Sequence, residues 1–229
     1  MCDSEALRAR VRSVRHRIAE ACRSAGRAPA DVRLLAVSKT RSAAEIRAAA
    51  TAGLTRFGEN HLDEAGAKQA ELAGLALEWH FIGPIQSNKT RAIAASFDWV
   101  QSVDRTRIVR RLGEQRDPEA APLNVLLQVN IDREPQKSGC PPEKIAELAD
   151  AVGRYPSLML RGLMAIPAAD NDDAQNRAAF GRMRGHFKQL RHDHPAVDTL
   201  SMGMSADLEI AIEQGSTMVR VGTALFGPR

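Results

Sequence analysis

Short apolar runs alternate with longer amphipathic stretches along most of this chain. The first stretch is predicted to be helical over Ser4–Ala25, and Gly26 follows it as a helix terminator. Its apolar residues recur at spacings of three and four positions, at Leu7, Val11, Val14, Ile18 and Cys22. From residue 32 onward the rhythm changes, because short apolar runs now lead repeatedly into helical segments.

The apolar runs are predicted strands, and the segments between them are predicted helices. The strands cover Val32–Ser38, Thr55–Gly58, Glu78–Ile82, Trp99–Val103, Asn124–Asn130, a segment within Leu158–Ile166, Thr199–Met202 and Met218–Val221. The helices cover Ser42–Ala52, Leu62–Leu72, Ser87–Ala95, Arg105–Arg116, Pro142–Val152, Asp172–Arg191 and Ala206–Gln214, and a short tail follows the last strand. Regular alternation predicts a parallel sheet, and eight such units in 229 residues predict a (β/α)8 barrel.

The alternative arrangement is a doubly wound open sheet. That fold would place a glycine-rich phosphate turn after its first strand, whereas this chain has Ser38, Lys39 and Thr40 there. The sequence contains no linker-like segment and no repeat beyond the strand–helix rhythm. We therefore predict an α/β protein with a single TIM-like (β/α)8 barrel domain over residues 1–229 and an extra N-terminal helix.

Composition and charge narrow the classes of function. The formal net charge is +4, but the one basic cluster, Arg8 to Arg17, spreads around the first helix without interleaved aromatic residues. We interpret it as a solvated surface and expect no nucleic-acid partner. Cys2, Cys22 and Cys140 form no CxxC motif, so we expect neither a disulfide framework nor a metal site. Without a signal-peptide core or a bilayer-length apolar run, we expect a cytoplasmic protein with no membrane partner.

Lys39 is the strongest candidate for chemistry. The chain has six lysines, and only Lys39 directly follows an apolar strand. In a TIM barrel the carboxyl ends of the strands form the mouth that holds the active site. A lysine withdrawn from water favours the neutral amine, which is the form that attacks an aldehyde to give a Schiff base. The alternative is a lysine whose stem follows the strand end and whose amine reaches solvent.

Two segments near the end of the chain predict a phosphate site. Ser205 is a candidate N-cap of the helix over Ala206–Gln214, and Gly222 and Thr223 precede another helix-like turn. Backbone N–H groups at a helix start attract anions, and TIM barrels often bind phosphate after the seventh and eighth strands. Taken singly, Ser205 also fits an ordinary N-cap and Gly222 an ordinary turn.

Several other residues near the strand ends allow two interpretations. Arg220 would bind a ligand acceptor or pair with a barrel carboxylate such as Glu59. Asn60 would orient a ligand or cap the following helix. His80 lies within an apolar strand, which favours a hydrogen-bonded core residue.

The remaining candidates are Ser201, which ends the seventh strand, and Met164, which we expect to pack or to line a flat ring. Lys89 and Lys137 lie in predicted loops, and we expect both to face solvent.

Taken in order from about residue 32 to 227, several fragments resemble the pyridoxal-phosphate homeostasis protein family. They read LLAVSKT, RFGEN, WHFIGPIQSNK, LLQVNIDREPQKSG, RGLMAI and LSMGMSADLEIAIEQGSTMVRVGTALFG. The resemblance implies a barrel similar to the N-terminal domain of alanine racemase, with pyridoxal 5′-phosphate (PLP) held as a Schiff base on Lys39. It assigns phosphate contacts to Ser205, Gly222 and Thr223, with Ser201 lining the site. It places Arg220 against the pyridine nitrogen, and Asn60, His80 and Met164 around the ring.

The same resemblance indicates little turnover. A charged arginine such as Arg220 donates a hydrogen bond to the pyridine nitrogen without protonating it, which leaves a weak electron sink. In alanine racemase a tyrosine from a second domain supplies the other base. This sequence ends at Arg229, after the predicted barrel, and its one tyrosine, Tyr155, is expected opposite the mouth.

We therefore expect a PLP-binding protein of vitamin B6 and amino-acid homeostasis rather than an enzyme. The alternative is a small PLP-dependent amino-acid racemase. Candidate partners are PLP itself and the PLP-dependent apoenzymes that would receive it. A lone barrel without the racemase's dimerising domain is expected to be a monomer.

Overall fold

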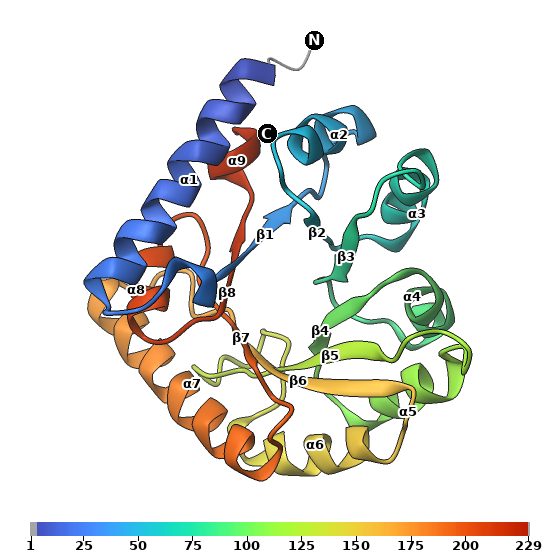
Figure 1. Cartoon of the computed structure of the whole chain (residues 1–229). Helices are drawn as coiled ribbons and strands as arrows, with labels where there is room; N and C mark the ends of the chain where they lie inside the picture. The colour runs from blue at the N-terminus through green and yellow to red at the C-terminus, as the bar shows by residue number, and fades with distance from the viewer. Residues whose placement is uncertain (1–3, 229) are drawn as a thin grey trace.

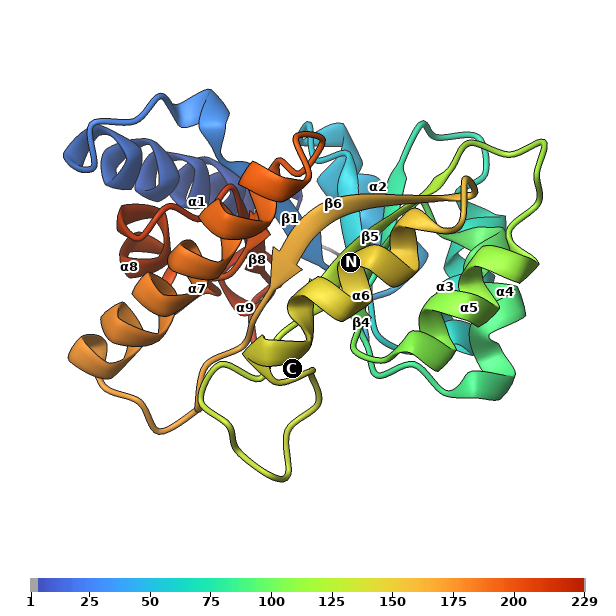
Figure 2. The ribbon, with the colours of Figure 1, turned by 90° about the horizontal axis from the view of Figure 1, so that it is seen from below.

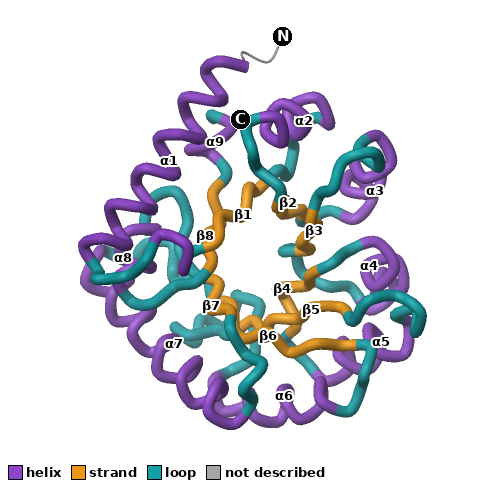
Figure 3. The backbone as a smooth tube through the Cα atoms, in the orientation of Figure 1, coloured by secondary structure: helices purple, strands orange, loops and turns teal. Residues whose placement is uncertain are grey.

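The predicted strands close into one parallel barrel in the computed structural model, which describes residues 4–228. Each strand pairs with its neighbours in chain order, and β1 also pairs with β8. The strands are β1 Arg33–Val37, β2 Arg56–Glu59, β3 Glu78–Phe81, β4 Trp99–Val103, β5 Leu123–Gln128, β6 Leu158–Met164, β7 Thr199–Ser201 and β8 Met218–Val221. Figures 1 and 3 look along the barrel and show the strands as an inner ring surrounded by helices.

The outer layer consists of α2 to α9, joined by the N-terminal α1. The bounds are α1 Ser4–Ser24, α2 Ala43–Thr51, α3 Leu62–Glu71, α4 Thr90–Ser96, α5 Thr106–Gln115, α6 Ile145–Gly153, α7 Asp173–Asp193, α8 Leu208–Glu213 and α9 Thr223–Phe226. Three 3-10 turns are η1 Pro29–Asp31, η2 Ser87–Lys89 and η3 Pro142–Lys144. The prediction of a TIM barrel with an extra N-terminal helix is thus confirmed.

Helix α1 completes the outer layer where the last two helices are too short to do so. α8 has 6 residues and α9 has 4, whereas α1 has 21 and packs against α8, α9 and α2. Figure 1 shows α1 lying across α8 and α9. Leu7, Val11 and Val14 supply its buried face, each no more than 2% exposed.

Two arginines of the basic cluster on α1, Arg10 and Arg17, bond to other parts of the protein. Our interpretation of the cluster as a solvated surface was wrong for these two residues. Arg10 Nε donates to the Leu225 carbonyl at 2.6 Å. Arg17 donates to the Glu209 carboxylate at 2.7 Å and to the Ser205 carbonyl at 2.9 Å. These bonds fasten α1 to the segments that follow β7 and β8.

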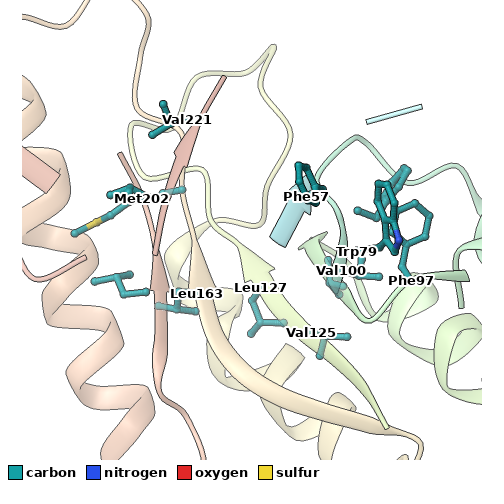
Figure 4. Close-up of a cluster of buried hydrophobic side chains, with 14 of the residues drawn as sticks. Phe57, Trp79, Phe97, Val100, Val125, Leu127, Leu163, Met202 and Val221 are labelled. Carbon is teal, nitrogen blue, oxygen red and sulfur yellow. The ribbon is translucent and has the colours of Figure 1, made fainter. Parts of the chain in front are cut away.

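The main apolar core lies between the barrel and the helices. Figure 4 shows side chains from several strands in this layer, including Phe57, Val100, Val125 and Leu163. A separate small cluster, Trp99, Leu126 and Met164, fills part of the barrel interior. Strands buried on both faces explain why the sequence shows apolar runs instead of strict alternation.

Three local expectations differ from the structure. The helix predicted over Ala206–Gln214 begins at Leu208, because the Asp207 carboxylate accepts the Met204 N–H at 2.6 Å and closes a separate turn before the helix. The helices predicted from Ser87 and Pro142 begin with the 3-10 turns η2 and η3. The helix-like turn expected after Gly222 and Thr223 is present as α9. Figure 2, turned by 90°, shows the long loop after β5 standing out at one end of the barrel.

Candidate functional site

Lys39 lies in a tight turn at the carboxyl end of β1. The Arg41 N–H donates to the Ser38 carbonyl at 3.0 Å, which closes the turn. Thr40 has φ 66°, a left-handed conformation that is rare for a β-branched residue. Lys39 is half-buried, and its amine has no hydrogen bond or ion pair with any of residues 4–228. The turn therefore presents an amine at the barrel mouth that the fold itself does not use.

A buried ion pair lies beneath this turn and fixes it. Lys68 from α3 is 6% exposed, and its amine donates to both Glu59 carboxylate oxygens, at 2.9 and 3.0 Å. The same amine donates to the Ser38 carbonyl at 2.9 Å and to Glu64 at 2.5 Å. Glu64 in turn accepts the Thr40 N–H at 2.7 Å. The backbone on both sides of Lys39 is thus held by one network of charged groups.

Glu59 is the centre of that network and is fully buried at the end of β2. Burial raises the pKa of Glu59 above its ordinary value, although the hydrogen bonds from Lys68 and Ser38 act in the opposite direction. The Ser38 hydroxyl donates to Glu59 at 2.6 Å. A carboxyl group in this position depends on Lys68, because an isolated buried charge is costly.

Lys68 is the residue that sequence reasoning missed. The sequence shows Lys68 only as one of the five lysines that do not follow an apolar strand, and it suggests Arg220 as a cation for Glu59. The signal was available in part, since a glutamate inside an apolar strand requires a cation and Glu64 and Lys68 stand at i, i+4 on one helix. The expected alternative pairing of Arg220 with Glu59 is wrong, because Arg220 bonds elsewhere.

Arg220 is a residue of β8 and is 4% exposed, and its guanidinium reaches the carboxyl ends of β6 and β7. Its Nη1 donates to the Ser201 carbonyl and hydroxyl, both at 2.8 Å, and its Nη2 donates to the Ala165 carbonyl at 2.9 Å. These bonds use three of the five guanidinium N–H groups and leave two for another acceptor. Burial lowers the pKa of Arg220 to about 10, against the opposing effect of Asp207, so the group stays protonated at neutral pH.

The three residues predicted to hold phosphate lie close together. The Ser205 hydroxyl accepts the Ala224 N–H at 3.4 Å, which joins the loop after β7 to the first turn of α9. Ser205 is not an N-cap, because Asp207 occupies that position of α8. Thr223 begins α9 and is exposed, and Gly222 precedes it.

The residues predicted to bind phosphate are also adjacent to β1, the strand that leads to Lys39. A Cβ placed on Gly222 would lie 3.4 Å from both the Cβ and the carbonyl oxygen of Val37 in β1. Hydroxyl groups of Ser205 and Thr223, with the backbone at Gly222, are a donor set suited to a phosphate group. The mouth thus combines phosphate donors with a lysine amine.

Asn60 supplies a further polar atom that the fold leaves without a partner. Its side-chain Oδ1 is buried and has no hydrogen bond within the described part of the chain. Buried polar atoms are nearly always paired in proteins, so a ligand donor would satisfy it. Asn60 does not cap the following helix, where His61 occupies the N-cap position. That alternative was therefore wrong.

Three other predicted site residues lie inside the barrel. Met164 is 1% exposed and packs in the interior cluster, and Ser201 is fully buried beside Arg220. His80 is fully buried with both ring nitrogens paired, to Gln101 at 3.0 Å and to Glu78 at 2.8 Å. The interpretation of His80 as a hydrogen-bonded core residue is confirmed. Direct contact of these residues with a bound ring stays a prediction.

The loop lysines differ from each other. The Lys89 side chain is 42% exposed and its amine lies 3.4 Å from the Asp63 carboxylate, so it reaches solvent as expected. Lys137 was expected to face solvent, but its amine donates to the Pro167 carbonyl at 2.8 Å and lies 2.6 Å from Glu134. It therefore ties the loop after β5 to the loop after β6.

Tyr155 lies in the segment between α6 and β6, at the amino end of the strands, where a Cβ on Gly113 would meet its ring at 2.4 Å.

Cys22 and Cys140 are free and buried, and burial raises the pKa of the Cys140 thiol to about 12. Cys2 is outside the described residues. Between residues 4 and 228, no three His, Cys, Asp or Glu side chains gather where they could hold a metal ion, and no helix is long and apolar enough to cross a membrane.

Comparison with known proteins defines the class of this barrel. Residues 3–229 match the family described as alanine racemase, N-terminal domain. Solved alanine racemases share the fold: the enzyme of Corynebacterium glutamicum superposes with a TM-score of 0.67 at 18% identity, over 94% of this chain and 61% of that one. The protein is thus a barrel of the alanine racemase N-terminal type.

Nearer relatives carry a more particular name. A pyridoxal phosphate homeostasis protein of Pseudomonas aeruginosa is 58% identical over 219 residues, covering 96% of this chain and 94% of that protein. One from Escherichia coli is 49% identical, covering 94% of each. PipY of Synechococcus elongatus, solved with PLP bound, has a TM-score of 0.82 and 36% identity over 96% of this chain and 100% of that one. The chain belongs to the pyridoxal phosphate homeostasis protein family.

Removal of the Lys68 amine tests the network beneath the Lys39 turn. We expect Lys68→Met to lower the free energy of unfolding by about 3–5 kcal/mol, because it leaves the buried Glu59 carboxylate without its cation. Urea unfolding measures this, with Lys188→Met, an exposed change on α7, as the matched control. The double variant Lys68→Met/Glu59→Leu should recover part of the loss. A single variant as stable as the control would contradict the role of the pair.

The buried imidazole of His80 predicts a pH dependence of stability. Burial lowers the pKa of His80, although the hydrogen bond to Glu78 acts in the opposite direction. The unfolded chain, with a histidine pKa of about 6.5, therefore binds the proton more readily than the folded protein. Stability should fall as the pH drops below that value, by up to about 1.4 kcal/mol per pH unit.

Urea unfolding between pH 5 and 7 measures this slope in the wild type and in His80→Gln. The slope should be shallower in His80→Gln and unchanged in Lys188→Gln, an exposed change on α7 that alters no group titrating between pH 5 and 7. Equal slopes in the wild type and His80→Gln would show that His80 takes up its proton equally well in both states.

Proposed function

We propose that this protein binds PLP as a Schiff base on Lys39 and serves vitamin B6 and amino-acid homeostasis in the cytoplasm. The observation that carries the proposal is the single mouth that joins the uncommitted Lys39 amine to the phosphate donors beside β1. The names of the relatives and the PLP-bound PipY structure support the same cofactor. We take residues 1–229 as one cofactor-binding domain.

Each residue of the mouth has a distinct part in this proposal. Ser205, Gly222 and Thr223 hold the phosphate group, and Lys39 binds the aldehyde carbon. The two uncommitted N–H groups of Arg220 face the pyridine nitrogen. Asn60, with Met164, Ser201 and His80 farther inside the barrel, shapes the site around the ring. Bound PLP supplies an electrophilic aldehyde and a conjugated ring, and the protein supplies the contacts that orient them.

We propose further that the protein carries PLP without substantial turnover. Arg220 donates a hydrogen bond but gives up its proton too weakly to protonate the pyridine nitrogen, because the pKa of its guanidinium stays near 10 even when buried. A racemase also needs a second base opposite the lysine. Tyr155, the one tyrosine, lies at the amino end of the strands, away from Lys39. PLP-dependent apoenzymes are the proposed recipients, and the proposed state is a monomer.

Cofactor attachment is tested by the absorbance of the purified protein after incubation with PLP. Wild type should develop a visible band, and borohydride should fix the cofactor on the peptide that contains Lys39. Lys39→Ala should lose the band, whereas Lys188→Ala, an exposed change on α7, should keep it. A band of full strength in Lys39→Ala would overturn the assignment of the lysine.

The proposed lack of turnover is tested by a chiral assay. The PLP-loaded protein, incubated with each of several L-amino acids, should form less than one equivalent of D-isomer per protein molecule. A PLP-loaded alanine racemase serves as the positive control. Sustained racemisation over many turnovers would favour the alternative function, a small amino-acid racemase.

A further inference from the structure

The side chain of Arg220 is the first member of a hydrogen-bonded chain that runs through the barrel interior. Its Nη1 donates to the Ser201 hydroxyl oxygen at 2.8 Å. The Ser201 hydroxyl donates to Gln101 Oε1 at 2.8 Å. All three side chains are buried, and they come from β8, β7 and β4, so the chain crosses from one side of the barrel to the other.

The chain continues to the opposite end of the barrel. Gln101 Nε2 lies 3.0 Å from His80 Nδ1, and His80 Nε2 lies 2.8 Å from Glu78 Oε1. Because the amide nitrogen can only donate, His80 Nδ1 must be the acceptor. The imidazole proton is therefore on Nε2, from which it donates to the Glu78 carboxylate. Stacking on Trp99, with ring centroids 5.2 Å apart, holds the imidazole plane.

Every hydrogen bond in this network runs in the same direction. Each donor lies on the side of the Arg220 guanidinium and each acceptor on the side of the Glu78 carboxylate. Hydrogen bonds aligned in this way polarise and strengthen one another in a medium of low dielectric constant. Arg56 adds a second donor to Glu78 at 3.0 Å, which secures the carboxylate as an ion. The two charged ends therefore fix the orientation of every neutral group between them.

The orientation matters most at Ser201. Its hydroxyl oxygen offers a lone pair to Arg220 only while its proton is engaged by Gln101 Oε1. Gln101 keeps that orientation because its N–H group has an acceptor in His80, and His80 accepts because its own proton is held by Glu78. A flipped Gln101 amide would set its oxygen against the unprotonated Nδ1 and its N–H against the Ser201 hydroxyl proton.

A barrel interior is ordinarily filled by apolar side chains, which need no such arrangement. Polar groups in this place cost stability unless each is paired. We propose that Gln101 and His80 are positioning residues, which hold the Arg220 guanidinium in the orientation that presents its two uncommitted N–H groups to the cofactor. This inference rests on the proposed function; it adds Gln101 to the site and gives His80 an effect on the cofactor through Arg220.

Gln101→Leu tests the proposal, because it keeps the approximate shape of the side chain and removes the two central hydrogen bonds of the network, to Ser201 and to His80. We expect PLP to bind roughly tenfold more weakly, because a misoriented Arg220 would lose one charge-assisted hydrogen bond to the cofactor. We also expect the visible band of the bound cofactor to shift, while borohydride still attaches it to Lys39. The matched control is Leu126→Met, a change in the barrel interior at a residue of β5 that takes no part in these hydrogen bonds. It should leave the PLP affinity and the visible band unchanged.

A second variant and a second measurement guard against a folding defect. Ser201→Ala removes only the hydroxyl and keeps the Ser201 carbonyl that Arg220 also uses, and it should reproduce the spectral shift. Nitrogen NMR of the cofactor-free protein should show His80 protonated on Nε2 alone in the wild type. In Gln101→Leu the proton should stay on Nε2, where Glu78 holds it, and the Nδ1 resonance should shift because that nitrogen has lost its hydrogen-bond donor.

The outcomes separate this inference from the proposed function. The inference would be overturned if the wild type binds PLP and the Gln101→Leu and Ser201→Ala variants keep the same affinity and the same visible band. The hydrogen-bond network would then have a structural role only. Wild type that binds no PLP would overturn both. A mixture of His80 tautomers in the wild type would overturn the directed chain whatever the cofactor does.

Discussion

Toward their carboxyl ends the strands of this barrel are largely buried on both faces, so the polar side chains that they carry there must find partners within the protein. This constraint governs the whole site. Glu59, Gln101, Ser201 and Arg220 all lie in or at the end of strands, and all are buried. None can be hydrated, and each would cost free energy if it stayed unpaired. The structure meets the constraint with two separate networks, which support opposite sides of the mouth.

The first network supports the lysine side. Glu59 and Lys68 form an ion pair below the turn after β1. Lys68 also donates to the Ser38 carbonyl, and Glu64, its second acidic partner, accepts the Thr40 N–H. The Lys39 amine is thus left without a partner while the backbone around it is fixed. The network holds the backbone and not the side chain, so the amine can move without loss of its support.

The second network supports the arginine side and has the opposite design. Here the functional side chain itself is held, by carbonyls of β6 and β7 and by the directed chain that ends at Glu78. The contrast fits the proposed roles, since a lysine that forms a covalent bond needs freedom and an arginine that presents donors needs a fixed orientation. Helix α1 adds a third support from outside, since Arg17 bonds to the Ser205 carbonyl beside the phosphate candidates. Sequence reasoning treated that arginine as part of a solvated surface.

The sequence by itself determined the barrel, because the alternation of apolar runs and amphipathic stretches is a local property of the chain. It also indicated Lys39, since a lysine directly after an apolar strand can be recognised without knowledge of its neighbours. Only the tertiary structure decided which charges pair. Glu59 pairs with Lys68 and not with Arg220, and Ser205 bonds to α9 and does not cap α8. The reason is that barrel closure sets distances between side chains far apart in the sequence, and the selection of a partner depends on those distances.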